Sequence, residues 1–166
     1  MTEVGESVEA LHARVDLEVE RLSRRHAKRL RCRSGCSSCC IDGITVFAVE
    51  AERIRRNHAA LLVLGVPHPV GACAFLDADG SCRIYADRPY VCRTQGLPLR
   101  WFVEDGEQRD ICELNDGEPD IVRLPATDCF TLGPFEEELV SLQTKAAGRP
   151  PRRWDRVPLR DLFEKT

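Results

Sequence analysis

The stretch Cys32-Arg-Ser-Gly-Cys36-Ser-Ser-Cys39-Cys40 contains four of the nine cysteines of this 166-residue chain. The other five follow singly and are widely spaced: Cys73, Cys82, Cys92, Cys112 and Cys129. A thiolate is a strong, soft ligand, so this density of cysteine indicates either a bound metal or disulfides. The choice between the two decides both the fold and the function.

Disulfides are the less favoured interpretation. The N-terminal sequence MTEVGESVEALHARVDLEVE is polar and acidic and lacks the features of a secretory signal. We therefore expect a cytoplasmic, reducing setting, where cysteine clusters are more often metal or redox sites. The cysteine count is odd, so full pairing would leave one thiol over. Cys39 and Cys40 are adjacent, and a bond between them would strain the backbone, because bridged Cα atoms usually lie ~5.5 Å apart.

Length and composition predict one modest domain that a metal would help to stabilise. Only 6% of the residues are aromatic, and the binding free energy of a metal is available to the folded state alone. The net charge is −3, so no global attraction to nucleic acid follows. The longest apolar run, residues 59–66, is too short to cross a bilayer. We expect neither nucleic acid nor a membrane as a partner.

The first thirty residues have the pattern of one amphipathic helix. Apolar residues recur at steps of three and four, which places them on one face: Val4, Val8, Leu11, Val15, Val19 and Leu22. Such a face must be covered. Packing against the rest of the chain is the favoured interpretation, and a homodimer or a protein partner held through this helix is the alternative.

The remaining elements predict a small α+β fold in which helices dominate, stabilised by metal and carrying short hairpins. We assign residues 1–31 to the N-terminal helix, 32–132 to a cysteine-rich metal-binding core, 133–148 to a C-terminal helix and 149–166 to an extended tail. Within the core we expect the following elements: a strand at 44–47, a helix at 49–64, a hairpin over 73–85, a short helix opened by Pro89, and a hairpin over 99–112 around Asp105-Gly106.

Charge is distributed unevenly along the chain. Residues 21–33 form a basic block of seven Arg and Lys with no acid between them, and residues 104–120 hold eight acids and one Arg. A basic helix can meet a phosphate backbone. Aromatic residues that would stack on bases are scarce near the block, so a solvated face, or a counter-charge to the thiolates and the acidic hairpin, is the favoured interpretation.

Cys36-x-x-Cys39 is typical of a metal knuckle, in which two thiolates on a tight turn hold one ion. No second CxxC is present, so further ligands must come from the scattered cysteines through the tertiary fold, as in many Fe–S and some zinc proteins. Arg88 and Arg93 flank Cys92 and are candidates for stabilising the negative charge of such a centre.

The whole cysteine pattern resembles the YkgJ-type cysteine-cluster proteins, the CxxCxxCC domain. The resemblance covers about residues 32 to 115, and its specific part is Cys82-Arg-Ile-Tyr-Ala-Asp-Arg-Pro-Tyr-Val-Cys92-Arg93. That family is described as chelating zinc or iron and as an Fe–S-cluster domain. The resemblance implies eight candidate metal ligands: Cys32, Cys36, Cys39, Cys40, Cys73, Cys82, Cys92 and Cys112.

These observations leave three functional hypotheses. The first is a protein with cysteine-ligated Fe–S centres that supports electron transfer or another redox step. The second is a zinc-stapled interaction module without chemistry, either monomeric or homodimeric. The third is a metalloenzyme in which an open coordination position does the catalysis.

Overall fold

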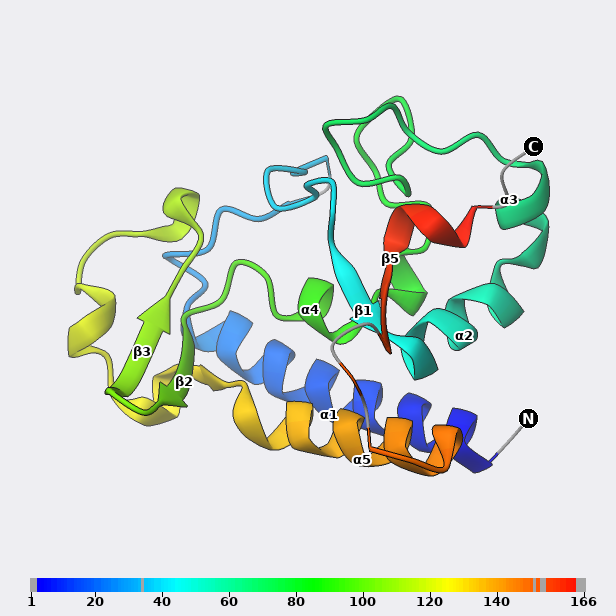
Figure 1. The fold of residues 1–166 in the computed structure, drawn as a ribbon. Helices are drawn as coiled ribbons and strands as arrows, with labels where there is room; N and C mark the ends of the chain where they lie inside the picture. The colour runs from blue at the N-terminus through cyan, green and yellow to red at the C-terminus, as the bar shows by residue number, and fades with distance from the viewer. Residues whose placement is uncertain (1–2, 34, 151, 153–154, 164–166) are drawn as a thin grey trace.

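The protein is described here by a computed structural model, which covers residues 3–33, 35–150, 152 and 155–163 (Figure 1). Its helices are α1 (Glu3–Arg25), α2 (Ala48–Asn57), α3 (Ala59–Leu64), α4 (Tyr90–Arg93) and α5 (Gly133–Ala147). Its strands are β1 (Thr45–Phe47), β2 (Leu99–Val103), β3 (Gly106–Asp110), β4 (Phe130–Thr131) and β5 (Arg156–Pro158). The chain is a single small α+β domain in which helix predominates, as the sequence predicts.

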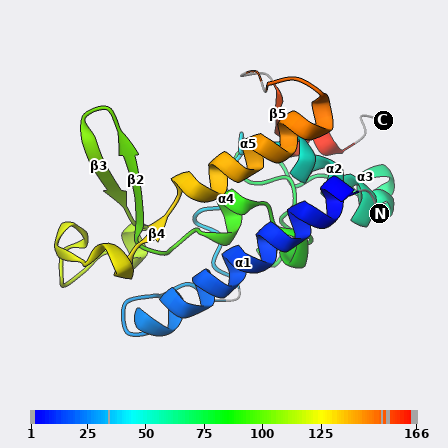
Figure 2. The ribbon, with the colours of Figure 1, turned by 90° about the horizontal axis from the view of Figure 1, so that it is seen from below.

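The long helix α1 packs inside the molecule. Val8, Leu11, Val15 and Leu22 are completely buried, and α1 lies alongside α5 in both views (Figures 1 and 2). The prediction that the rest of the chain covers this face is confirmed. The helix ends at Arg25, earlier than its apolar pattern suggests.

The predicted helix over residues 49–64 is two helices, α2 and α3. His58 lies between them with φ −126° and ψ 27°, which is not helical. Its Nε2 lies 2.9 Å from Oδ2 of Asp87, and Asn57 donates a hydrogen bond to Oδ1 of the same carboxylate at 3.1 Å. The break coincides with a contact to a residue about thirty positions later, which the local pattern cannot reveal.

Two small sheets are present in the described ranges. In one, β2 pairs with β3 in an antiparallel hairpin around Asp105-Gly106, as predicted, and β4 adds in parallel to β2. In the other, β1 pairs with β5. The prediction of a regular hairpin over residues 73–85 needs correction. The segment forms one isolated antiparallel bridge, between Leu76 and Cys82, and a 3₁₀ turn follows at Tyr85–Asp87.

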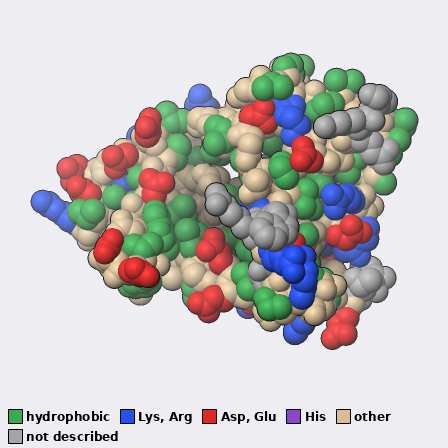
Figure 3. Space-filling view, viewed as in Figure 1, with side chains coloured by type: hydrophobic (Ala, Val, Ile, Leu, Met, Phe, Trp, Pro, Cys, Tyr) green, Lys and Arg blue, Asp and Glu red, His purple; other side chains and the backbone are tan. Residues whose placement is uncertain are grey.

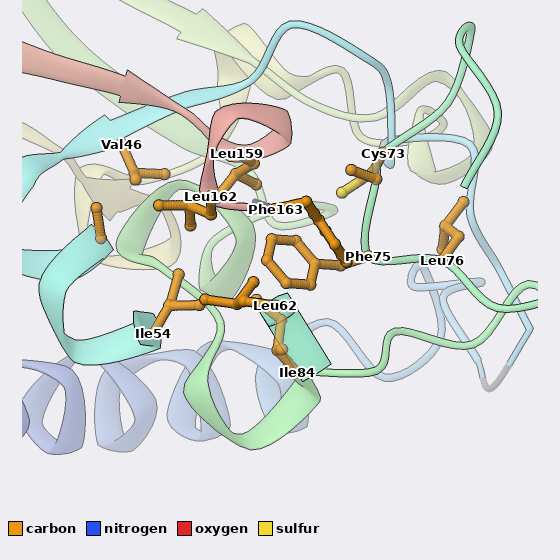
Figure 4. Close-up of a cluster of buried hydrophobic side chains, with 12 residues drawn as sticks. Val46, Ile54, Leu62, Cys73, Phe75, Leu76, Ile84, Leu159, Leu162 and Phe163 are labelled. Atoms are coloured by element: carbon orange, nitrogen blue, oxygen red, sulfur yellow. The ribbon is translucent and has the colours of Figure 1, made fainter. Parts of the chain in front are cut away.

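One hydrophobic core lies under the loops that follow α3 (Figure 4). The rings of Phe75 and Phe163 pack against each other there, with centroids 4.9 Å apart and ring planes tilted by 43°. Cys73 is buried at the edge of this cluster. A second core lies between α1 and α5 and includes Tyr90 and Phe130.

The C-terminal tail is not a free arm. β5 pairs with β1 through Val46↔Val157, and a 3₁₀ turn follows at Leu159–Leu162. Leu159, Leu162 and Phe163 are buried in the first core. Within the predicted extended tail, residues 156–158 are an extended strand, and residues 159–162 instead form a turn whose apolar side chains are buried.

Residues 99–128 form a lobe at one end of the molecule, where acidic side chains gather (Figures 1 and 3). The basic block at the end of α1 contacts this lobe. Arg21 donates to the carbonyl oxygen of Thr127 at 2.9 Å, Arg25 donates to the carboxylate of Asp128 at 3.0 Å, and Arg29 donates to the carbonyl of Pro119. Part of the basic block therefore has partners within the chain. Among the described residues, no helix combines the length and apolarity needed to span a membrane.

Candidate metal centre

The cysteine knuckle is a loop of tight turns between α1 and β1. The backbone N–H of Cys36 donates to the carbonyl of Arg33 at 3.0 Å, and that of Cys40 donates to the carbonyl of Ser37 at 2.8 Å. Gly35 has φ 81°, a conformation that glycine adopts without steric cost. These turns leave Cys36, Cys39 and Cys40 half-buried.

Five thiols from distant parts of the sequence gather near the first core, and we call them the thiol group: Cys39, Cys40, Cys73, Cys82 and Cys92. Cys40, Cys73 and Cys82 belong to the first core or pack against it. A thiolate at Cys73 would raise the pKa values of Cys40, Cys82 and Cys92, so these four side chains lie within electrostatic reach of one another. Five of the eight predicted ligands thus lie in one region of the fold, although among the described residues no three of them are close enough to hold an ion.

A backbone hydrogen bond joins two of the three segments at the thiol group. The N–H of Cys73 donates to the carbonyl of Cys40 at 2.8 Å, which joins the loop after α3 to the knuckle. The antiparallel bridge between Leu76 and Cys82 then turns the chain back, so that Cys82 comes near the segment that carries Cys73. Cys92 lies on α4, which begins after Pro89, where the absence of a backbone N–H costs no helical hydrogen bond.

The thiols of the neighbouring residues Cys39 and Cys40 interact with each other. The thiol of Cys40 donates a hydrogen bond that lowers the pKa of Cys39 to about 6, and the nearby Arg88 acts in the same direction. The same hydrogen bond raises the pKa of Cys40, and burial and the charges of Cys39, Cys73 and Cys92 add to this effect. The interaction thus favours the thiolate form at Cys39 and disfavours it at Cys40.

Burial raises the pKa of the other three thiols. It raises that of Cys92 to about 12, with further contributions from the charges of Cys73 and Cys82. Burial also raises the pKa values of Cys73 and Cys82. Several thiolates could not form in this environment without a nearby cation, because each would repel the next in a partly desolvated site. A soft dication such as zinc or iron matches this donor set.

The two predicted arginines have different surroundings. The positive charge of Arg88 acts to lower the pKa values of Cys39, Cys82 and Cys92, and in Cys82 and Cys92 it opposes the effect of burial. This guanidinium therefore lies near the thiol group. Its guanidinium carbon lies 3.7 Å from the ring centroid of Tyr85, over the ring.

Arg93 is buried and has other partners. It donates to the carboxylate of Asp16 at 2.5 Å and to the carbonyls of Ala86 and Arg88 at 2.8 and 2.6 Å. These contacts tie α4 to α1 and to the segment before Pro89. The guanidinium thus supports the backbone that carries Arg88.

The remaining cysteines lie outside the thiol group. Cys32 is exposed and accepts a hydrogen bond from Asn115, and Cys112 begins the turn that carries Asn115. The Sγ of Cys36 lies 3.8 Å from the hydroxyl of Ser38. Cys129, which the sequence did not assign as a ligand, is buried next to β4.

All nine thiols are free, so none forms a disulfide. Within the described ranges, no three Cys, His, Asp or Glu side chains are close enough together to hold an ion as they stand. The thiol group is therefore a gathered donor set and not a closed coordination shell. Cysteine has one rotatable side-chain bond, so changes of rotamer are the available way to close it.

Sequence reasoning missed two groups that position these segments. Asp87, held by Asn57 and His58, anchors the segment that carries Arg88. Glu50 accepts a hydrogen bond from the N–H of Tyr90 at 2.6 Å and so holds the start of α4. The sequence did contain a sign of the role of Glu50, because this acid lies on the apolar face of an otherwise amphipathic helix. Asp87 gave none, because its partners come together only in the fold.

A comparison with models of known protein families assigns this cysteine-rich domain to one family. The model of the CxxCxxCC family, described as a "putative zinc- or iron-chelating domain", matches residues 31–113. The chain belongs to that family, as its cysteine pattern predicts, and this membership supports metal binding. Searches of the curated proteins and of the solved structures found no match.

Proposed function

We propose that the protein binds iron as a cysteine-ligated Fe–S cluster at the thiol group and supports electron transfer. The observation that carries this proposal is the gathering of five half-buried or buried thiols beside Arg88, from three segments. A structural zinc ion and an Fe–S cluster each take four thiolates, and ligands scattered along the chain, as here, are typical of many Fe–S proteins. An Fe–S cluster would supply one-electron chemistry when bound.

The residues of the chain have distinct parts in this proposal. Four of the five thiols would hold the cluster, and Arg88 would offset the negative charge of a four-thiolate site and so raise its reduction potential. The first core shields Cys73 from water. Exclusion of water and fixed positive charge are two means by which a protein sets such a potential.

A zinc-stapled structural module is the second candidate. Cys40, Cys73 and Cys82 border the first core, so an ion among them would join the knuckle to the loop after α3. In this case the metal would contribute folding free energy and no redox chemistry.

Metal analysis of the whole chain separates the two candidates. The protein is purified without oxygen, and iron, zinc and acid-labile sulfide are measured per chain. The proposal expects iron and sulfide together, with a brown colour. Zinc without sulfide supports the second candidate, and a folded protein that takes up neither metal contradicts both.

Two matched cysteine variants locate the metal. Cys92→Ser removes a member of the thiol group and should lose most of the bound metal. Cys129→Ser removes a buried thiol whose pKa responds to Arg109, Arg100, Glu107 and Asp128 and not to the thiol group, so it should keep the metal. Equal retention in the two variants would contradict the assignment.

A further inference from the structure

Arg160 joins the C-terminal segment to two segments that carry cysteines. It lies in the 3₁₀ turn at Leu159–Leu162. Its Nε donates to Oδ1 of Asp42, in the cysteine knuckle, at 2.9 Å. Its two terminal nitrogens donate to three backbone carbonyls in the loop after α3, at 2.7, 3.4 and 2.8 Å respectively: His68, Pro69 and Ala72. One guanidinium therefore contacts the knuckle and this loop together.

These contacts surround the place where the knuckle meets the loop. Asp42 follows Cys40 by two residues, and Ala72 directly precedes Cys73. Between them, the N–H of Cys73 donates to the carbonyl of Cys40 at 2.8 Å. Asp42 also reaches the loop by itself, because its Oδ2 accepts from the N–H of Gly71 at 3.1 Å. Side-chain and backbone contacts together thus fix the spacing of the two cysteine-bearing segments.

The packing of the tail delivers Arg160 to this position. Leu159 and Leu162, in the same turn, belong to the first core (Figure 4). The N–H of Leu159 also donates to the carbonyl of Ile44 at 2.9 Å. A guanidinium presents five N–H donors in one plane, whereas the ammonium of lysine is a compact charge on a flexible stem. The contacts to a carboxylate and to several carbonyls use this planar set of donors.

We propose that Arg160 is a positioning residue for the metal centre and sets the spacing of Cys40 and Cys73 through Asp42 and the loop carbonyls. The inference rests on the proposed function, because it requires that the thiol group bind metal. The family match ends at residue 113. The C-terminal segment is therefore a part of the metal-binding unit that the matched region does not contain.

A purely structural role for Arg160 predicts a different result. If Arg160 only fastened the tail, another arginine that fastens the same tail would affect metal binding equally. Arg156 offers this comparison. It donates to the carbonyl of Thr45 at 2.9 Å, and its guanidinium carbon lies 4.2 Å from the centroid of the Phe47 ring. These contacts join the tail to β1 and not to the segments that carry Cys40 and Cys73.

The test uses the full chain, stripped of metal and shown by denaturant unfolding to be folded. It is titrated with Zn²⁺ against a competing chelator, and with Co²⁺, whose absorption spectrum reports thiolate ligation. Arg160→Lys keeps the positive charge but not the planar donors. It should weaken zinc binding about tenfold, as is usual when a group that orients a ligand is lost, and should alter the Co²⁺ spectrum. Arg156→Lys is the matched control and should keep the wild-type affinity and spectrum.

Asp42→Asn is the second variant if Arg160→Lys does not fold. Its amide has one acceptor oxygen, so it cannot accept from Arg160 and Gly71 through separate oxygens as the carboxylate does. It should also weaken zinc binding, and the losses in the double variant should be less than additive, because the two residues share one contact.

Two results would overturn the inference and leave the proposed function standing. One is wild-type zinc affinity in a folded Arg160→Lys or Asp42→Asn chain, and the other is an equal loss in Arg156→Lys. A wild-type chain that takes up neither Zn²⁺ nor Co²⁺ would also overturn the inference. Iron and sulfide analysis of the purified chain then decides the proposed function separately.

Discussion

The cysteine side chains of the thiol group differ in how easily they lose their protons. The hydrogen bond from Cys40 lowers the pKa of Cys39 to about 6, while burial raises that of Cys92 to about 12. A metal ion must therefore displace protons from most of its thiol ligands at neutral pH. The lowered pKa of Cys39 favours its thiolate form, which is the form that binds metal.

Metal affinity should consequently rise with pH. The raised pKa values of Cys73, Cys82 and Cys92 mean that these thiols hold their protons at pH 6, and each proton released on binding makes the affinity pH-dependent. Zinc titration at pH 6, 7 and 8, each with a competing chelator, should show a steady gain. An affinity that does not change over this range would contradict protonated thiol ligands.

Arg88 should strengthen metal binding through its charge. Arg88→Ala removes the positive charge that lowers the pKa values of Cys39, Cys82 and Cys92. We expect zinc affinity to fall by about tenfold, at the lower end of the effect of groups outside the ligand set. Arg88→Lys should restore part of the loss. Arg55→Ala, at an exposed arginine of α2, is the control, and an equal loss there would contradict a specific role.

At the scale of single elements, α4 depends on a buried acid from α2. Glu50 accepts from the N–H of Tyr90 at 2.6 Å, and its Oε1 lies 2.9 Å from Nε2 of His12 on α1. The side chains of His12 and Glu50 are 4% and 2% exposed. This contact joins three helices at the point where the chain turns toward Cys92.

Glu50→Ala should therefore destabilise the metal-free fold by about 3 kcal/mol, since it leaves a buried partner unpaired. Denaturant unfolding measures the change. Glu52→Ala, at an exposed acid two residues later on the same helix, should change stability by less than about 0.5 kcal/mol. Similar effects of the two substitutions would show that the buried contact does not hold α4.

Local sequence patterns predicted the elements whose cause is local. The spacing of Val8, Leu11 and Val15 correctly predicted α1, and Asp105-Gly106 correctly predicted the β2–β3 hairpin. Gly148, with φ 65°, ends α5 as predicted. The break between α2 and α3 was missed, because it coincides with the contact of His58 with Asp87. The pairing of β1 with β5 was missed for the same reason: both depend on contacts between distant segments.

The candidate site was predicted in part. Chemistry identified the cysteines as metal-ligand candidates, but spacing alone could not divide them into a group of five and a separate Cys32 held by Asn115. Nor could it distinguish Arg88, near the thiols, from Arg93, which is bound to Asp16. These distinctions depend on the directions of side chains in the folded chain.

At the scale of the whole molecule, the C-terminal segment and the cysteine loops share one core. Phe163 packs on Phe75, two residues from Cys73, and the guanidinium carbon of Arg83 lies 5.3 Å from the centroid of the Phe163 ring. The loops that carry the thiols contain little regular structure of their own. Their positions therefore depend on the packing of a segment from the far end of the chain.

Phe163→Ala should destabilise the fold by about 3–5 kcal/mol, the cost of removing a buried aromatic side chain. It should also weaken zinc binding, because Cys73 would lose its packed support. Leu64→Ala, at a side chain 82% exposed on α3, is the control and should have little effect. Full stability in Phe163→Ala would contradict the packing of the tail.

X-ray absorption spectroscopy of the metal-loaded protein tests the central claim most directly, since it identifies the atoms bound to the metal. We predict that sulfur forms the nearest shell, at about 2.3 Å. This result should hold for either iron or zinc. A nearest shell made of nitrogen or oxygen atoms, at about 2.0–2.2 Å and without sulfur, would contradict a thiol-built centre.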